Sequence, residues 1–219
     1  MDIRTITTKS RIEEGLLSLL EKKEFAKCNV SDIVECAEIS KRTFYTYYKG
    51  KHDLLNAVEV RLIEGLEESL AKDRETLTRL ERIPSAEEIN QLADIAFNNT
   101  IAFCNQNKGA FSKLLSSNGD IYFYQKIIKV GNHEFDNRFP YLFHEKKMML
   151  NDSLTLRFIR NLYVHGIIDI LVLWSRNDGL IGTKDVKRLL GLTQTKSPLE
   201  LVNLYKVELK FYHNEKQLL

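Results

Sequence analysis

Residues 40–55 read SKRTFYTYYKGKHDLL, and no acidic residue occurs in this stretch before Asp53. Basic and aromatic side chains share the stretch: Lys41, Arg42, Lys49, Lys51, Phe44, Tyr45, Tyr47 and Tyr48. A core does not require cations, and a solvated surface does not require clustered tyrosines. The composition therefore predicts a surface that meets an anion. The alternative is a solvated basic face above an aromatic core.

The flanking residues predict two short helices joined by a tight turn. Asn29 is placed as an N-cap with Asp32 three residues later, and Ser40 is the N-cap of a second helix that ends near Tyr48. The link Glu38-Ile39-Ser40 between them is short enough for a helix-turn-helix. A longer helix is expected to begin near His52. In such a unit, the second helix enters the DNA major groove.

Helical spacing sorts the residues of the second helix by role. Phe44 and Tyr48 are four residues apart, so they can pack together as core. The remaining side chains are candidates for DNA contact: Lys41, Arg42 and Thr43 in the first turn, Tyr45 and Tyr47 further along, and Lys51 at the start of the next helix. Basic side chains can donate to the acceptor pair of guanine, and tyrosine hydroxyls can donate to phosphates.

The sequence of residues 29–55, NVSDIVECAEISKRTFYTYYKGKHDLL, resembles the DNA-binding signature of the tetracycline-repressor (TetR) family. That signature has a polar cap, Val-x-x-Ile-Ala, an Ala-Gly-Val-Ser turn, and Thr-(Phe/Leu)-Tyr-x-(Tyr/His)-Phe before a Lys and x-x-Leu. The resemblance covers about the first 66 residues. This chain departs from it at Val34, at Glu38 in the place of the turn glycine, and at Tyr48.

The resemblance implies roles by position. Lys41, Arg42 and Thr43 fall where the recognition helix reaches bases or flanking phosphates, and Tyr45 and Tyr47 fall at groove and phosphate contacts. Lys51 falls at a phosphate contact that opens the fourth helix, and Ser31 is a further phosphate candidate. The implied protein is a transcriptional regulator, a repressor that binds a palindromic operator in double-stranded DNA as a homodimer. The alternative is a DNA-binding adaptor of the same fold that recruits a protein partner and senses no small molecule.

Helical spacing recurs along the whole chain, while strand-like alternation is hard to find. Behind the front helices, we expect helices over residues 86–106, 109–117, 119–136, 152–177, 184–192 and 198–214. The expected fold is all-α, with an N-terminal three-helix helix-turn-helix DNA-binding domain over residues 1–52. A larger C-terminal helical domain over residues 53–219 would serve ligand binding and dimerisation.

The resemblance also implies that the last helices pair two subunits. The segments 152–177 and 198–214 carry the apolar stripes that suit this role, and the candidates on them are Leu171, Trp174, Val202, Tyr205 and Leu209. Gly166 would allow a close helix approach. The alternative is that these side chains pack within one subunit.

A small-molecule effector is a further implication of the resemblance, and polar residues inside apolar helices are the sequence evidence for its site. The candidates are Asn98, Asn161, His165 and Asp169. His165 and Asp169 are four residues apart, so the carboxylate could orient the imidazole. The alternatives are a hydrogen-bonded buried pair, a pair at the dimer seam, or a metal site.

Several classes of protein are disfavoured. The chain has no Gly-rich phosphate loop, HExxH or GxSxG, so we expect neither an enzyme nor a cofactor. Cys28, Cys36 and Cys104 have no zinc or disulfide spacing, so we expect no metal site and interpret them as buried apolar residues. A net charge of +2 over 219 residues requires any DNA contact to be a local patch. No signal peptide or membrane span is expected, which favours the cytoplasm.

Overall fold

The computed structural model describes residues 3–143, 154–177 and 181–205, and within these ranges the chain forms helices and no strands. The helices are α1 (Ile3–Leu20), η1 (Phe25–Lys27), α2 (Val30–Cys36), α3 (Lys41–Tyr47), α4 (Lys51–Arg74), η2 (Glu75–Arg79), α5 (Ala86–Ala93), α6 (Asn98–Gln106), α7 (Lys108–Leu114), α8 (Phe123–Phe143), α9 (Leu154–Arg176) and α10 (Thr183–Thr195). Residues 198–205 are also helical. The all-α prediction is confirmed. None of the described helices has the length and apolar character needed to cross a membrane.

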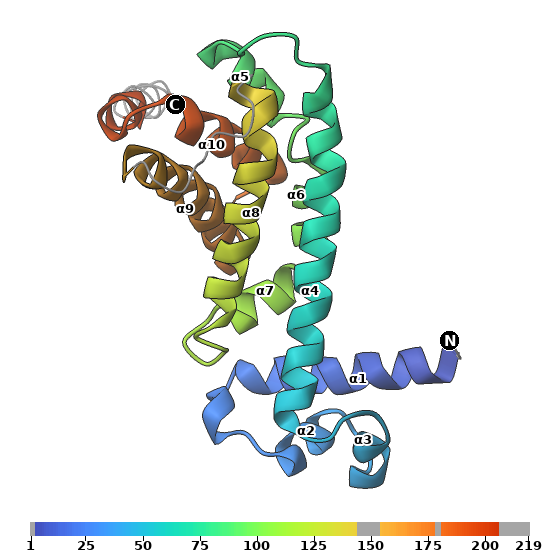
Figure 1. Ribbon diagram of the computed structural model, residues 1–219. Helices are drawn as coiled ribbons and strands as arrows, with labels where there is room; N and C mark the ends of the chain where they lie inside the picture. Colours follow the sequence, from blue (N-terminus) through green and yellow to red (C-terminus); the bar gives the residue numbers. More distant parts are fainter. Residues whose placement is uncertain (1–2, 144–153, 178–180, 206–219) are drawn as a thin grey trace, which may run out of the picture.

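The molecule divides into a small head and a larger body that share one long helix (Figure 1). The head consists of α1, α2 and α3, packed around the first turns of α4. The rest of α4 runs up one side of the body, where α8 lies beside it and α9 and α10 lie beyond α8. The boundary expected at residue 52 falls inside the first turn of α4, so this helix belongs to both parts.

The head core joins all of its helices. Ile12, Leu16, Ile33 and Phe44 are fully buried there, which agrees with the expected inward position of Phe44. Helices α1 and α2 approach closely at Gly15, where an added Cβ would lie 2.8 Å from the Cβ of Ala37. Cys28 and Cys104 are buried as expected. Cys36 is exposed, because it lies at the end of α2 on the outer side.

Two buried carboxylates hold the body helices to α4. Asp73, near the end of α4, accepts hydrogen bonds from the backbone N–H groups of Asn99 and Thr100, at 2.9 and 2.8 Å, and from both of their side chains. Glu134 of α8 accepts from Arg138 Nε at 2.7 Å and pairs with Arg74 of α4. Because a buried charge without partners is costly, these carboxylates fix where α6 and α8 meet α4.

Two helix boundaries differ from the expected ones. The segment expected as a single helix over 86–106 is α5 and α6, separated by a turn over residues 94–97, because Asp73 caps a new helix start near Asn98. The helix expected over 119–136 begins at Phe123 and continues through Pro140 to Phe143. Its start is delayed by a tight loop in which the Asp120 N–H donates to the Leu114 carbonyl at 3.2 Å.

Candidate nucleic-acid interface

Side-chain caps define the two short helices of the head, as the sequence predicts. Asn29 accepts from the Asp32 N–H at 3.0 Å, and Asp32 accepts from the Asn29 N–H at 3.0 Å, so α2 begins with a complete capping box. Ser40 accepts from the Thr43 N–H at 3.0 Å and begins α3. These bonds occupy backbone donors that a helix start otherwise leaves unpaired. They therefore fix the residues at which α2 and α3 begin.

The turn between α2 and α3 contains a strained residue. Glu38 has φ of 51°, the only positive φ of a non-glycine residue in the described chain. Glycine adopts this conformation without steric cost, which explains the glycine that the TetR signature has here. Arg11 of α1 donates to the Glu38 carbonyl at 3.2 Å and lies 3.4 Å from its carboxylate. This contact ties the turn to α1.

Three side chains of α3 point away from the core on neighbouring turns. Lys41, Arg42 and Tyr45 are exposed, and their spacing of three and four residues places them on one side of the helix. Tyr45 rests edge-on against the buried Phe44, with ring centroids 5.5 Å apart. This contact restricts the Tyr45 ring while its hydroxyl remains available. The arrangement presents two cations and a phenol from a rigid helix.

The other expected DNA contacts have more complex surroundings. The Thr43 hydroxyl is half-buried and lies 2.8 Å from Ser40 Oγ, so it also supports the cap. Tyr47 is half-buried beneath Lys9 of α1, whose ammonium lies 6.0 Å from the ring centroid. Ser31 is exposed in the first turn of α2. Lys9 was not a sequence candidate, because only the packing of α1 beside α3 places this cation next to the tyrosine.

Lys51 lies in a different environment from the one expected of a phosphate contact. Its ammonium donates to three backbone carbonyls, those of Phe25 at 3.1 Å, Ala26 at 3.0 Å and Cys28 at 2.8 Å. It also lies 4.9 Å from the centroid of the Phe25 ring. An ammonium has three protons, and three acceptors already surround this one. Lys51 therefore joins the start of α4 to the end of η1.

The expected effector residues do not gather at one site. Asn98 is exposed and accepts from Lys187 of α10, and Asn161 is exposed on α9. Tyr124 of α8 lies between the other two: its hydroxyl donates to Asp169 Oδ1 at 2.8 Å and lies 3.3 Å from His165 Nδ1. Burial and the Asp169 carboxylate raise the pKa of Tyr124 to about 12, so the phenol remains a donor.

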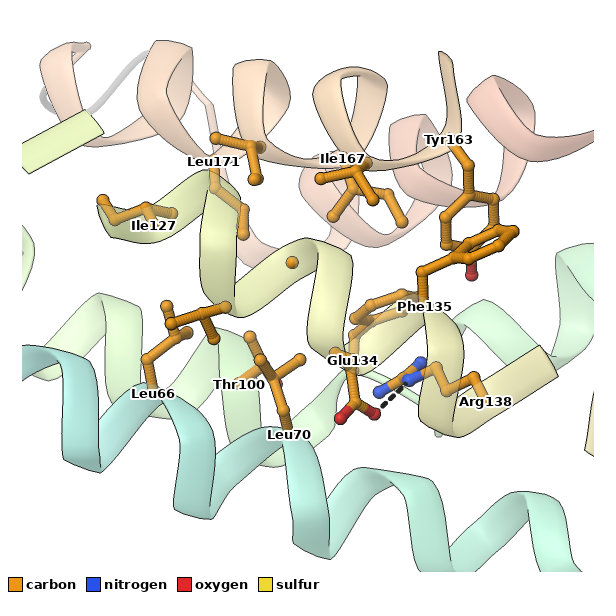
Figure 2. Close-up of a pocket in the computed structure, with 15 residues that line it drawn as sticks. Leu66, Leu70, Thr100, Ile127, Glu134, Phe135, Arg138, Tyr163, Ile167 and Leu171 are labelled. Carbon is orange, nitrogen blue, oxygen red and sulfur yellow. Dashed lines mark hydrogen bonds and ion pairs between the residues drawn. The ribbon is translucent and has the colours of Figure 1, made fainter. Parts of the chain in front are cut away.

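The body contains an apolar cavity between α4, α8 and α9 (Figure 2). Its free volume is about 50 Å³. It is lined by Leu66, Leu70, Phe97, Thr100, Ile127, Val130, Gly131, Glu134, Phe135, Arg138, Tyr163, Val164, Ile167, Ile168 and Leu171. The Glu134–Arg138 ion pair lies on one side of it. The four effector candidates from the sequence are not among the lining residues: Asn98 and Asn161 are exposed, and His165 and Asp169 contact Tyr124 of α8 outside the cavity.

The expected dimer residues divide into two groups. Leu171 lines the cavity, and Trp174 is 2% exposed and donates its indole N–H to the Ile181 carbonyl at 3.0 Å, so both pack within the subunit. Gly166 approaches Thr193 of α10 rather than the outer surface. Val202 and Tyr205 are exposed, and Leu209 lies outside the described residues.

These observations define a helix-turn-helix protein whose second helix exposes cations and a phenol. Residues 14–58, the greater part of the head, match the family described as bacterial regulatory proteins, tetR family. This match identifies the head as a DNA-binding domain of the TetR family. No curated protein matches the chain.

The whole fold is similar to those of solved TetR-type regulators. A TetR transcriptional regulator from Streptococcus agalactiae 2603V aligns with 88% of this chain and 96% of its own length, at 20% identity and a TM-score of 0.52. The fatty acid degradation regulator FadR from Bacillus halodurans aligns with 87% of this chain and 96% of its own length, at 17% identity and a TM-score of 0.55. At these identities the likeness concerns the fold alone.

The position of Lys51 leads to a prediction about stability. Lys51→Ala removes the donor shared by three carbonyls, and we expect it to destabilise the head by about 1–3 kcal/mol. Thermal unfolding measured by circular dichroism would show this as a lower Tm. Lys49→Ala, which removes an exposed cation two residues earlier, should leave Tm within about 1 °C because exposed sites contribute little. If Lys51→Ala leaves Tm unchanged and weakens the salt dependence of DNA binding, Lys51 contacts a phosphate instead.

Proposed function

We propose that the protein is a homodimeric repressor that binds a palindromic operator in the cytoplasm and releases it when an effector binds the body. The main support for sequence-specific DNA binding is the exposed face formed by Lys41, Arg42 and Tyr45 on α3. This helix is capped at its N-terminus, and the Tyr45 ring packs against Phe44. In a major groove, this face brings donors to guanine edges and to phosphates. One such helix covers few base pairs, which favours two heads on a twofold site.

Arg42 is the residue that we expect to read bases. Arg42→Ala should weaken operator binding by about 1–3 kcal/mol and relax the preference at one base pair of each half-site. Fluorescence anisotropy with the operator and with single-base variants would measure both effects. Lys72→Ala removes the same charge in the last turn of α4, at the end away from the head, and should leave affinity unchanged. Equal losses on every variant sequence would contradict base readout by Arg42.

The proposed dimer face is an apolar stripe on the outside of α9. Leu154, Phe158, Leu162 and Leu173 are each more than half exposed, and the first three repeat every four residues along one side of the helix. Leu199, Val202 and Tyr205, on the helix over residues 198–205, are further exposed apolar side chains. A large exposed apolar surface marks an interaction site, and twofold symmetry requires a self-complementary one. A second copy of the chain meets both requirements.

Leu162 lies in the middle of that stripe. We expect Leu162→Asp to produce monomers in sedimentation-velocity experiments, because the carboxylate would be buried against its own copy in the dimer. The monomer should also lose operator affinity. Ile121→Asp, at an exposed apolar residue of the α7–α8 loop, is the matched control and should remain dimeric. A dimeric Leu162→Asp variant would remove α9 from the interface.

The proposed effector is a small and mainly apolar molecule that enters the cavity shown in Figure 2. The lining is almost entirely apolar, with Glu134, Arg138 and Tyr163 as the ionisable groups. Burial raises the pKa of Tyr163, so its phenol stays protonated. The free volume is far below the roughly 300 Å³ of a typical ligand site, so binding must separate α4, α8 and α9. This separation would move the head through α4. The effector shifts the equilibrium toward the opened state only if it binds that state more tightly than the closed one.

Fatty acids are the first compounds to test, since one protein of similar fold is a regulator of fatty acid degradation. We expect a bound fatty acid to raise the Tm of the wild-type protein. Ile167→Phe should fill the cavity and abolish this shift, whereas Ile121→Phe at an exposed position should retain it. An equal shift in Ile167→Phe would place the binding site elsewhere.

The small free volume also favours a second candidate, a DNA-bound adaptor that recruits a protein partner. In that case the cavity is ordinary core, and the body acts through its surface. Two results together would support this alternative. The dimeric protein would bind its operator specifically without any change in Tm when apolar compounds are added, and a protein partner would bind the body directly.

A further inference from the structure

A buried carboxylate lies where the head meets the body. Glu59 of α4 is 2% exposed, and its Oε2 pairs with the ammonium of Lys126 of α8. Its Oε1 is buried and has no hydrogen-bond partner among the described atoms. The carboxyl of Asp120, in the loop between α7 and α8, is the second acid that acts on Glu59, and it raises the pKa of Glu59. The charged groups that act on Glu59 are therefore one ammonium and one further carboxylate.

This arrangement is one proton short of complete pairing. With both carboxyls ionised, two negative charges share one ammonium, and an acceptor faces an acceptor. One added proton lets Glu59 donate to Asp120 while Lys126 balances the remaining charge. Carboxyl pairs at such close range commonly hold a single proton between them.

The loop that carries Asp120 also holds the head. The Asn118 carbonyl accepts from the Phe25 N–H at 2.7 Å, and the Asn118 side chain donates to the Leu20 carbonyl at 3.0 Å. An added Cβ at Gly119 would lie 2.0 Å from the Leu114 carbonyl oxygen, so the loop is tightly folded. A displacement of Asp120 relative to α4 is therefore passed to the end of α1 and to η1.

We propose that Glu59 and Asp120 form a proton-binding pair that locks the α7–α8 loop to α4 and so fixes the orientation of the head. When the pair loses its proton, repulsion between the two carboxylates loosens the loop and the head with it. As a means of regulation, this pair rests on the proposed DNA-binding function. Its effects on the stability of the free protein do not depend on DNA.

The sign of the pH effect follows from the environment of Glu59. Burial raises the pKa of Glu59 above its ordinary value of 4.5, the Lys126 ammonium lowers it, and the Asp120 carboxyl raises it further. A raised carboxyl pKa means that the folded protein binds the proton more tightly than the unfolded chain. The stabilisation is present below pH 4.5 and is lost as the pH rises through the raised pKa.

Glu59→Gln tests the proposal because the amide mimics the protonated acid. Its oxygen can accept from Lys126, and its NH₂ group can donate to Asp120. We expect the variant to have a higher Tm than wild type at pH 7.5, with the difference shrinking as the pH falls toward 4.5. Glu68→Gln, at an exposed carboxylate of the same helix, is the matched control and should show no such pH-dependent difference.

Hydrogen exchange of the Phe25 amide reports on the junction itself. After correction for intrinsic exchange, its protection in the wild type should fall with rising pH, by about tenfold for each unit by which the pKa is raised. In Glu59→Gln it should remain constant, and in the wild type the Ile101 amide in the body should change less with pH than the Phe25 amide.

Equal pH dependence of Phe25 protection in wild type and Glu59→Gln, or a lower Tm of the variant at pH 7.5, would overturn the proposal. Asp120→Asn supplies an independent variant, because its amide can donate to Glu59 while its oxygen still accepts from the Tyr122 N–H. It should reproduce the Glu59→Gln result, and wild-type behaviour would overturn the proposal. Failure to find an operator would contradict the proposed function and would leave these outcomes unaffected.

Discussion

The head and the body share α4, one continuous helix from Lys51 to Arg74. At 1.5 Å per residue, its 24 residues span roughly 36 Å. Both ends are anchored by groups with several partners: Lys51 reaches three carbonyls of the head, and Asp73 caps α6 in the body. A rotation of α4 in the body therefore reaches α1 and η1 without a flexible linker to absorb it.

The DNA-binding face depends on local hydrogen bonds, whereas its orientation depends on distant ones. Asn29 and Ser40 begin α2 and α3 through bonds to residues three positions away. The direction in which the whole head points is set instead by contacts between α1, η1 and the α7–α8 loop, such as the bond from Phe25 to Asn118. With this separation, the orientation of the head relative to the body can change while the head keeps its own geometry.

The features predicted correctly from the sequence are those with short-range causes. The caps and the inward side of Phe44 follow from spacing within one or two helical turns. The break between α5 and α6 was missed because its cause, Asp73, is 26 residues away from its partner Asn99. The surroundings of Lys51 were missed for the same reason, since its acceptors lie 23 to 26 residues earlier.

Helix α9 shows a different limit of prediction. It carries apolar residues on both its inner and outer sides, so periodicity alone does not distinguish Leu171, which faces the cavity, from Leu173, which is exposed. The pairing of His165 and Asp169 was expected from their spacing, yet Tyr124 of another helix mediates it. Both results depend on the packing of α8 against α9.

The central claim is that the head reads a specific DNA sequence as one half of a twofold pair. The most direct test is to select fragments from the organism's sheared DNA with the purified protein at near-physiological salt and to sequence what is bound. The account predicts a shared palindrome with half-sites about one helical turn apart or a multiple of it. Bound fragments without a common sequence, released by a modest increase in salt, would show that residues 40–55 only hold phosphate and would contradict the account.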